Sequence, residues 1–325
     1  MTVSALSLDR AAYRPHALHQ GDARVWGETN CYVDLWIEVV HALGHDPHAL
    51  LGCALASDFS HDQWLFFKPS ASDLYAFYGL DVQELTIYRP LLAHARTHLA
   101  AGRLLLVEVD AYHLPDTRGV SYRQKHTKTT VALDTLDTDA RSLRYFHNAG
   151  YYELSGEDFD ALFAPIDAAA GGLVPYTEYV RVGMPAPLPD AELAARARAS
   201  LAAHLARAPV ENPFARYRAC FRDDLAALTQ EPAEAFHEYA FATIRQFGAA
   251  FELAGAYLGW LGARGLDGVD DARAGCELIA SHAKTLQFKA ARAVMLKRAA
   301  EFDGLFDEME RAWTAVYDGL RRVHR

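Results

Sequence analysis

The spacing of hydrophobic positions divides the chain into two halves with different secondary structure. Up to about residue 185, short apolar runs of strand length alternate with a few helical segments. Beyond that point, apolar residues recur every three or four positions over long stretches, as they do along one face of a helix. The Pro-rich stretch 184–190 between the halves is typical of a stiff connector. We therefore expect an α+β domain over residues 1–184 and an all-helical domain over residues 190–325.

In the first half, an amphipathic helix precedes most of the strands. Its residues 31–43 carry apolar side chains at the spacing of a single helical face: Val33, Trp36, Ile37, Val40 and Leu43. Asn30 suits the N-cap of this helix and Gly44 suits its end. The other predicted elements are a helix over 91–101 and strands over 64–67, 103–110, 129–133 and 143–146. We expect a helix packed on an antiparallel sheet whose strands come late in the domain.

The second half contains only helical patterns. The predicted helices cover 190–206, 233–248, 250–261, 270–298 and 300–323. The stretch 270–298 is long enough to contain a break. A helical bundle is the simplest arrangement of these elements.

Composition and charge narrow the class of protein. The chain of 325 residues is 51% hydrophobic and 23% charged, which is ordinary for a globular protein. Its net charge of −10 argues against nucleic-acid binding. The most apolar stretch, 247–263, is shorter than the roughly 20 residues that a membrane span needs and contains Glu252. The N-terminus has no secretory leader and the four cysteines are far apart, so we expect a cytoplasmic protein with reduced thiols and no membrane contact.

One cysteine stands where a nucleophile would be placed. Cys31 lies on the first turn of the helix predicted over 31–43. The thiolate is the reactive form of cysteine, and the positive end of a helix stabilises a thiolate and a developing oxyanion. A small, buried and unreactive thiol is the alternative interpretation.

A cysteine nucleophile needs a base for its proton and a third group that orients the base. His126 directly precedes a predicted strand, where a rigid sheet would hold its ring at a cleft; a solvated loop residue is the alternative, and His113 and His147 are the other candidates. Asn148 follows the next strand and could fix the imidazole tautomer, or it could simply form a turn. The chain order Cys31, His126, Asn148 is that of papain-like proteins.

Three segments of the first half resemble a known family. They are Asn30-Cys31-Tyr32, the stretch Val107-Glu-Val-Asp-Ala-Tyr-His-Leu-Pro-Asp116, and Lys125-His126 with the strand after it. Together they resemble the papain-like N-terminal domain of butirosin biosynthesis protein H. The whole chain is similar to an uncharacterised family of bacterial proteins related to that domain and associated with amino acid–carrier protein ligases. In the helical half the similarity runs through 247–253 and 284–290.

The resemblance implies a papain-like fold and the transfer of an acyl or aminoacyl group through a cysteine thioester. Carried over residue by residue, it makes Cys31 the nucleophile, His126 the base and Asn148 the orienting group. The donor would be a carrier protein bearing a phosphopantetheine thioester, the acceptor would be a small molecule, and the chain would need no cofactor or metal of its own. A cysteine hydrolase (amidase, peptidase or thioesterase) and a non-catalytic carrier-protein-binding module remain open as alternatives.

The chain departs from papain-like peptidases at the oxyanion-binding position. Those enzymes carry a Gln six residues before the cysteine, where this chain has Val25. A backbone N–H of Cys31, or else Asn30 or Gln20, would have to bind the oxyanion instead.

Other polar and aromatic residues are candidates for substrate contacts. Asp110 is expected at the edge of the cleft, where it would hold the His126 loop or a substrate ammonium. Trp26 and Tyr112 are expected to line the cleft, with core packing as the alternative. Asp110, His113 and Asp116 also have the chemistry of metal ligands, but a turn at this point and the absence of a second cluster argue against a metal site.

Two basic faces stand out in the acidic helical half. The first consists of Arg216, Arg218 and Arg222; the second consists of Lys284, Lys289, Arg292, Lys297 and Arg298. Such faces are usually solvated surface. The functional hypothesis is that one of them docks an acidic carrier protein or its phosphopantetheine phosphate.

Overall fold

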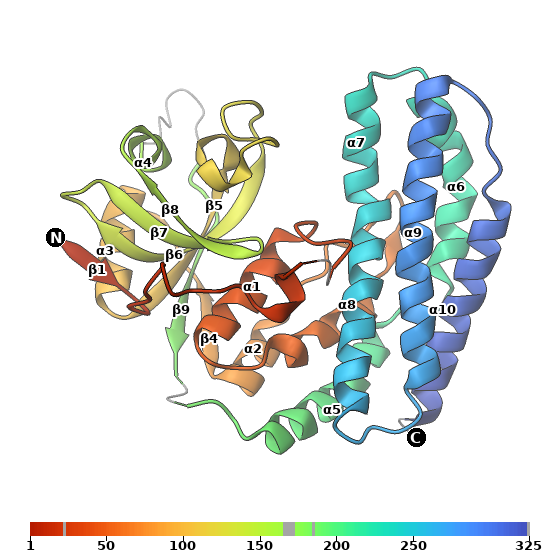
Figure 1. Cartoon of the computed structure of the whole chain (residues 1–325), viewed down its shortest axis with the longest axis horizontal. Coiled ribbons are helices and arrows are strands. Elements are labelled where there is room, and N and C mark those ends of the chain that lie inside the picture. The colour runs from red at the N-terminus through yellow and green to blue at the C-terminus, as the bar shows by residue number, and fades with distance from the viewer. Residues whose placement is uncertain (22–23, 165–172, 184–185, 324–325) are drawn as a thin grey trace. The chain divides into compact units, whose positions relative to one another are not determined.

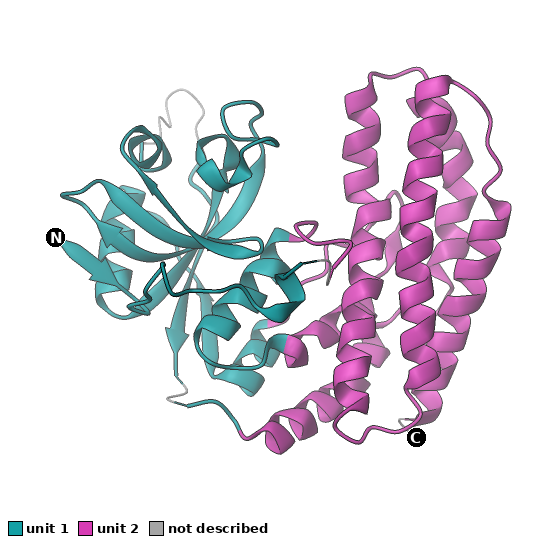
Figure 2. Ribbon diagram, viewed as in Figure 1, with its two compact units in different colours: residues 1–23, 31–47, 71–188 teal, residues 24–30, 48–70, 189–325 magenta. Residues whose placement is uncertain are grey.

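The computed structural model describes residues 1–21, 24–164, 173–183 and 186–323, and the chain divides into two compact units (Figures 1 and 2). Unit 1 comprises residues 1–23, 31–47 and 71–188, and unit 2 comprises residues 24–30, 48–70 and 189–325. The predicted order, an α+β region followed by an all-helical region, is confirmed. The first two residues of the predicted connector, 184 and 185, lie outside the described residues. The sequence predicted a single domain boundary near residue 185, whereas segments 24–30 and 48–70 of the first half belong to the helical unit 2.

The strands of unit 1 form an antiparallel sheet. Among the described residues its order is β4-β9-β5-β6-β7-β8, with β1 paired to β6. The bounds are β1 Thr2–Ser4, β4 Leu80–Glu84, β5 Arg103–Asp110, β6 Lys128–Asp137, β7 Ser142–His147, β8 Gly150–Ser155 and β9 Thr177–Val182. The sequence predicted β5, β6 and β7, which are the strands with the most continuous apolar runs. These three lie side by side in the middle of the sheet, whereas β4 and β8 form its edges.

Helices cover both faces of this sheet. They are α1 Cys31–Ala42, α2 Ala71–Tyr78, α3 Leu91–Ala100 and α4 Glu157–Leu162, with short 3-10 turns at Ala17–His19, Ala111–His113 and Pro115–Thr117. Leu105 and Val107 of β5 pack in one cluster with Leu99 of α3. Because side chains alternate across a strand, Glu108 and Asp110 belong to the opposite face. That face is the one on which α1 packs, against β6, β7 and β8.

Unit 2 is built mainly from helices. They are α5 Asp190–Arg207, α6 Pro213–Leu228, α7 Ala233–Ala242, α8 Ile244–Gly262, α9 Asp270–Leu296 and α10 Asp303–Val323. A 3-10 segment over Pro47–Ala56 begins at the last residue of unit 1 and continues into unit 2, which also contains a hairpin of β2 Phe59–Ser60 and β3 Gln63–Trp64. The strand predicted over 64–67 therefore reduces to Trp64. The helix over 270–296 is unbroken, and the break predicted near residue 249 lies instead at Thr243.

Two features of unit 2 explain its packing. Trp26 is buried against α8, where a Cβ at Gly248 would lie 2.5 Å from its indole ring. Only a glycine therefore allows this segment to approach the helix so closely. None of the helices in the described ranges combines the length and the apolar character that crossing a membrane requires.

Candidate functional site

The start of α1 places Cys31 on the sheet face described above. Cys31 is the first residue of α1 and is partly exposed. Its neighbour Tyr32 is buried and donates a hydrogen bond from its hydroxyl to Glu178 Oε2 of β9, at 3.0 Å. This bond fixes the first turn of the helix next to β9. In the described part of the chain the Cys31 thiol has no hydrogen-bond partner.

Glu178 lies between two tyrosines near this helix start. It accepts hydrogen bonds from Tyr32 and, at 3.0 Å, from the Tyr176 hydroxyl. Burial and the negative charge of Glu178 raise the pKa of Tyr32, and the same two causes raise the pKa of Tyr176 to about 12. Both hydroxyls therefore remain neutral donors at physiological pH, and Glu178 is committed to holding them.

A histidine–carboxylate pair lies on the same face, where β5 ends and β6 begins. His126 Nδ1 is 2.5 Å from Asp110 Oδ2. The pairing of β5 with β6 brings them together, since Asp110 is the register partner of Lys128. Asp110 Oδ1 also accepts from the backbone N–H groups of Tyr112 and Thr127, at 3.0 and 3.2 Å. Burial opposes ionisation of Asp110, but these hydrogen bonds outweigh it and lower the pKa of the carboxyl group.

The ring of His126 is held on one side only. Tyr112 stacks on it with ring centres 4.5 Å apart and an angle of 14° between the rings. The side chain of His126 is nevertheless 74% exposed, and its Nε2 has no partner among the residues the structure describes. A neutral imidazole that donates from Nδ1 to Asp110 carries its lone pair on Nε2. The arrangement is therefore suited to accepting a proton from a group that approaches from solvent.

Cys31 and His126 share a face of unit 1, but no hydrogen bond joins them. Glu178, which fixes the start of α1, is the register partner of Leu106 in β5. Asp110 lies four residues further along the same strand. The start of α1 is thus held next to β9, whereas His126 lies where β5 ends and β6 begins, and no hydrogen bond or ion pair of the described residues joins the predicted nucleophile to the predicted base.

The predicted orienting residue, Asn148, does not hold His126. Asn148 forms the turn between β7 and β8 with a positive φ of 45°, and its Oδ1 is buried without a hydrogen-bond partner in the described ranges. The alternative, His147, is also engaged elsewhere, since its Nδ1 is 2.5 Å from Asp116 Oδ2 and its Nε2 is 2.8 Å from Thr129 Oγ1. Asp110, which we expected at the cleft edge holding the His126 loop or a substrate ammonium, is the carboxylate that contacts the His126 ring.

The remaining predicted site residues have structural partners. The Nδ2 of Asn30 donates to the Phe67 carbonyl at 2.7 Å, and Asn30 is fully buried. Trp26 is 3% exposed and donates from its indole to the Ala280 carbonyl at 3.0 Å, which is the core-packing alternative. The Gln20 amide donates to the Pro15 carbonyl. Of the expected oxyanion donors, this leaves the backbone N–H of Cys31.

A cavity opens beside Asp110. It measures about 620 Å³, and all of its lining residues belong to unit 1. Its walls combine apolar side chains, among them Leu91, Val109 and Leu162, with the charged side chains of Arg89, Glu108 and Asp110. This mixture is typical of small-molecule sites. Sequence reasoning found Asp110 but missed Arg89, because Arg89 belongs to a loop far from Asp110 in the chain.

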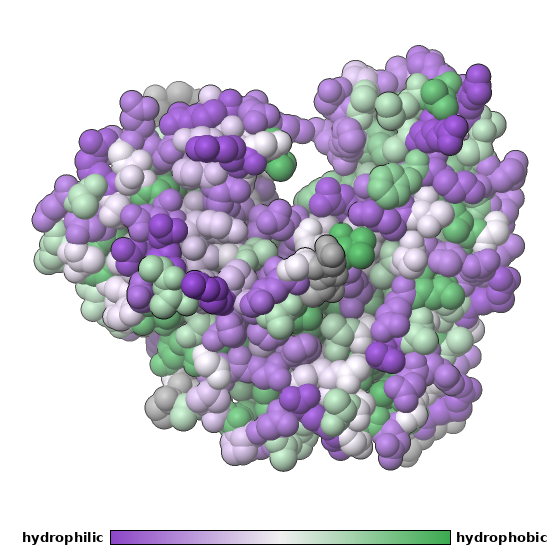
Figure 3. Space-filling view, viewed as in Figure 1, coloured by the Kyte–Doolittle hydropathy of each residue, from purple (hydrophilic) through white to green (hydrophobic). Residues whose placement is uncertain are grey.

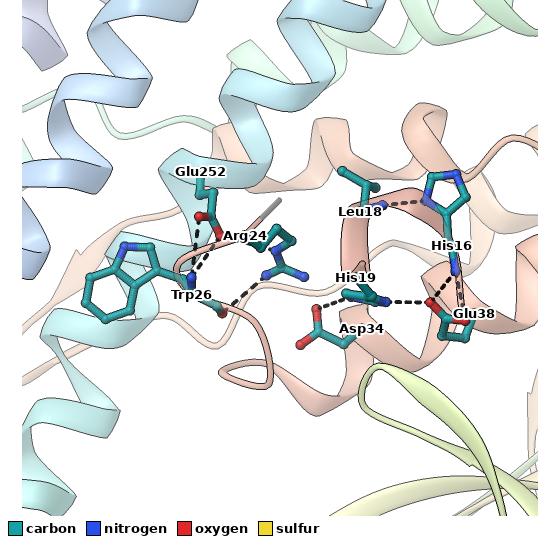
Figure 4. A network of polar contacts seen from close by, with 8 residues as sticks. All are labelled: His16, Leu18, His19, Arg24, Trp26, Asp34, Glu38 and Glu252. Atoms are coloured by element: carbon teal, nitrogen blue, oxygen red, sulfur yellow. Dashed lines mark hydrogen bonds and ion pairs between the residues drawn. The ribbon is translucent and has the colours of Figure 1, made fainter. Parts of the chain in front are cut away.

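A buried ion network lies along α1 and was not predicted. Figure 4 shows His19 between two carboxylates, with Nδ1 2.5 Å from Glu38 Oε1 and Nε2 3.3 Å from Asp34 Oδ1. The His19 ring is 1% exposed and both carboxylates are fully buried. Tyr13 donates its hydroxyl to Glu38 as well. The signal was present in the sequence, since Asp34 and Glu38 stand four residues apart on an otherwise buried helix.

Asp116 ties down the loop that carries Tyr112 and His126. It accepts hydrogen bonds from Tyr145 at 2.5 Å and from His147, and both it and His147 are almost fully buried. Asp158 of α4 accepts from Tyr122 and Arg123, at 2.9 and 2.5 Å. These contacts attach the loop 111–127 to β7 and α4 and so position the His126–Asp110 pair. Asp110 and Asp116 thus contact different histidines, His126 and His147.

Comparison with known proteins identifies the two halves separately. The model of the DUF1839 N-terminal domain matches residues 14–182, and the model of the DUF1839 C-terminal domain matches residues 190–322. No curated protein matches the chain significantly.

Proposed function

The chain belongs to the DUF1839 family, and from the geometry of its own site we propose that it is a cysteine-dependent acyltransferase. The hydrogen bond from His126 Nδ1 to Asp110, which leaves Nε2 open to an incoming group, is the observation that carries the proposal. Cys31 at the start of α1 supplies the nucleophile on the same face. The proposal includes a papain-like arrangement, related to the butirosin protein H domain, of a cysteine on a helix and a histidine on a strand.

The first half-reaction forms an acyl-enzyme. The Cys31 thiolate attacks the carbonyl carbon of an acyl or aminoacyl thioester held on the phosphopantetheine arm of a carrier protein. The backbone N–H of Cys31 and the positive end of α1 stabilise the oxyanion of the tetrahedral intermediate. The intermediate collapses with loss of the carrier thiolate, so one thioester replaces another at similar free energy.

The second half-reaction transfers the acyl group to a small-molecule acceptor. Nε2 of His126 removes a proton from an acceptor amine or thiol as it attacks the acyl-Cys31 carbonyl. Asp110 stabilises the imidazolium that results and fixes the tautomer of the ring, as the acid does in a catalytic triad. Cys31 then leaves as a thiolate, and the imidazolium proton returns to solvent. The cycle needs no cofactor besides the arm of the carrier and suits a cytoplasmic protein.

The cavity beside Asp110 is suited to the acceptor. Its charged walls, Arg89, Glu108 and Asp110, would bind a polar head group, and its apolar walls would bind a short carbon chain. Glu108 already forms an ion pair with Lys128 at 2.9 Å, which leaves Arg89 and Asp110 as the charged wall groups best placed to meet a ligand. The proposal also requires His126 to approach Cys31 when substrate binds, since catalytic contacts commonly tighten only in the complex.

The exposure of His126 favours hydrolysis as a second candidate function. A ring that is 74% exposed can activate water as readily as an amine. The same Cys31 and His126 would then act as an amidase, peptidase or thioesterase. A non-catalytic binding module, the remaining alternative, would also have no hydrogen bond between Cys31 and His126.

Product analysis distinguishes these candidates. The chain is incubated with an acylated carrier protein and a mixture of amino acids and amines, and the acyl products are identified by mass spectrometry. Acyl amide that forms with the wild type but not with Cys31→Ala supports transfer, and free acid supports hydrolysis. Equal turnover by the wild type and Cys31→Ala, or none by either, would refute a catalytic role for Cys31. Cys220→Ala is the control, because Cys220 is also partly exposed but lies in unit 2.

A further inference from the structure

The two basic faces predicted from the sequence differ in their partners. On α6, Arg216 pairs with Asp58, and Arg222 pairs with Asp303 at 2.6 Å. Arg218 contacts three carboxylates, and they raise the pKa of its guanidinium. The first basic face is therefore neutralised within unit 2 and offers no free charge to a partner.

The second basic face, which we call the α9 face, is not neutralised. Its cations are Lys284, Lys289, Arg292, Lys297 and Arg298, and none of them forms an ion pair with a carboxylate of the described residues. Lys284 lies over the rings of Trp26 and Phe288, and Lys289 donates to the Glu301 carbonyl. No acidic residue occurs between Glu277 and Glu301. Five positive charges thus stand together on a chain whose net charge is −10.

Large apolar side chains are exposed on the same face. Phe288 is 63% exposed, Met295 77% and Leu296 51%. Lys284, Phe288 and Arg292 follow one another at four-residue intervals, so cationic and apolar side chains alternate along one side of the helix. The opposite side is the one that packs in the bundle, with Ala283, Leu286, Ala290 and Ala293 buried. Figure 3 shows apolar and hydrophilic surface interleaved at the upper end of the helical unit, where α9 ends in Figure 1.

The C-terminal end of a helix accounts for part of this pattern only. Lys297 adopts a left-handed conformation after the last turn, and cations at this position stabilise the helix dipole. That reason does not extend to Arg292, which stands a turn earlier. The helix dipole also does not explain why Phe288 and Met295 are exposed to solvent. Their exposure costs hydrophobic free energy unless a partner covers them.

We propose that the α9 face docks an acidic amphipathic helix of a second protein. Residues 284–296 span about 20 Å at 1.5 Å per residue, which is the length of a helix of three to four turns. Carboxylates on such a helix would meet the five cations, and its apolar side chains would cover Phe288, Met295 and Leu296. If the function proposed above holds, that protein is the carrier that delivers the thioester. Only this identification of the partner depends on the proposed acyltransferase function.

The chemistry of the face favours a protein over other anionic partners. The phosphates of a nucleic acid would contact the five cations of the α9 face, but its binding would leave the three apolar side chains in water. The net charge of −10 on the chain would also repel it. A membrane surface would require a broad apolar face with cations at its borders, whereas here the two alternate along one narrow stripe.

Binding to a holo acyl carrier protein, the probe for this surface, tests the proposal. Affinity is measured by isothermal titration calorimetry at 20 and 200 mM NaCl with the full chain. We expect saturable binding that weakens with salt, and a loss of affinity of at least about tenfold in Arg292→Glu, Arg298→Glu and Phe288→Ser. Arg222→Glu is the matched control, because it reverses an exposed but paired charge on the same unit; we expect a change of less than about threefold.

The outcomes separate docking from catalysis. Cys31→Ala should bind the carrier protein as the wild type does, even though it should transfer no acyl group. Absence of binding at 20 mM NaCl, or equal losses in Arg292→Glu and Arg222→Glu, would overturn the docking proposal and leave Cys31 chemistry untouched. Stronger binding to phosphatidylglycerol vesicles than to the carrier protein, abolished by Arg292→Glu, would also overturn it in favour of a membrane surface.

Discussion

His126 Nδ1 lies 2.5 Å from Oδ2 of Asp110, and this contact joins the segment that leads into β6 to the last residue of β5. Since both strands are in the centre of an antiparallel sheet, the position of the pair is set by backbone pairing. The hydrogen bond at Nδ1 therefore holds the imidazole in one tautomer, while Nε2 stays open to solvent. This is the arrangement expected of a general base that receives its proton from a bound molecule.

Cys31 should react with thiol probes faster than Cys220. Burial and the charge of Asp224 raise the pKa of Cys220, so its thiolate is scarce at pH 7.5. Cys31 is partly exposed as the first residue of α1, so a probe can reach its sulfur. Iodoacetamide labelling followed by peptide mass spectrometry should show a rate at Cys31 at least about tenfold higher. Equal rates at the two cysteines would contradict a reactive role for Cys31.

Asp110 rather than Asn148 should support catalysis. Asp110→Asn removes the carboxylate that holds His126 and should lower kcat at least about 100-fold. Asn148→Gly is the comparison, since glycine tolerates the positive φ at this turn, and it should stay within about threefold of the wild type. Acyl transfer kinetics measure both. The opposite ranking would restore Asn148 as the orienting residue.

The folded chain should lose stability as the pH falls from 7.5 to 5.5. Burial lowers the pKa of His45, His94 and His98, and neutral His94 accepts a hydrogen bond at Nε2 from the Tyr88 N–H. The unfolded chain binds protons near pH 6.5 while the folded chain resists them, so this stability is present above about 6.5 and is lost below it. The carboxylates with lowered pKa, such as Asp110, titrate below their ordinary value of 3.8 and do not contribute in this window.

Urea denaturation at the two pH values measures this loss. The midpoint should be lower at pH 5.5, and in His94→Gln the difference between the two pH values should shrink. A midpoint that is unchanged or higher at pH 5.5 would show that these histidines are not neutral in the folded state.

Asp116→Ala should destabilise the chain by about 3 kcal/mol, because it leaves His147 and Tyr145 buried without their acceptor. Asp160→Ala breaks an exposed ion pair with Arg141 and should cost less than about 1 kcal/mol. The free energy of unfolding in urea gives both values. Similar costs for the two variants would mean that the loop 111–127 is not held by Asp116.

Two glycines should respond to alanine in opposite directions. In Gly248→Ala the new methyl group would meet the indole ring of Trp26 at 2.5 Å, and overpacking should cost about 2 kcal/mol. A methyl group added at Gly319 in α10 would meet nothing within 4 Å outside its own helix, so Gly319→Ala should stabilise the helix by up to about 1 kcal/mol. Thermal unfolding of the two variants decides; a neutral Gly248→Ala would contradict the packing of Trp26 on α8.

Several elements of the fold follow from local sequence patterns. The helix at Cys31–Ala42 and strands β5 and β6 have long apolar runs or a clear helical face, and the structure confirms them. The short edge strand β4 and its partner β9 escaped prediction because they carry charged residues such as Asp81 and Arg181, which form an exposed ion pair. α6 was missed although Asn212, which accepts from the Phe214 N–H, and Pro213 form an ordinary helix start.

The site was harder to predict because its partners meet through register. His126 and Asp110 were each singled out, but their hydrogen bond depends on the antiparallel pairing of β5 with β6, which sequence spacing does not specify. Asn148 was chosen on chain order alone, and order along the chain says nothing of the direction in which a turn residue points. The role of segment 24–30 in the helical unit depends on the close approach of Trp26 to Gly248, a contact with no local sequence pattern.

Detection of an acyl group on Cys31 tests the central claim most directly. The chain is mixed with acylated carrier protein, quenched in acid within seconds and digested with trypsin. Because Lys68 and Arg89 each precede a proline, which blocks cleavage, digestion yields one peptide, 25–96, containing both Cys31 and Cys53. Fragmentation then locates the acyl group. We predict a thioester on Cys31 that accumulates in His126→Ala and is absent from Cys31→Ala. An acyl group on the buried Cys53 or elsewhere, or a turning-over enzyme with no adduct at Cys31, would contradict the account.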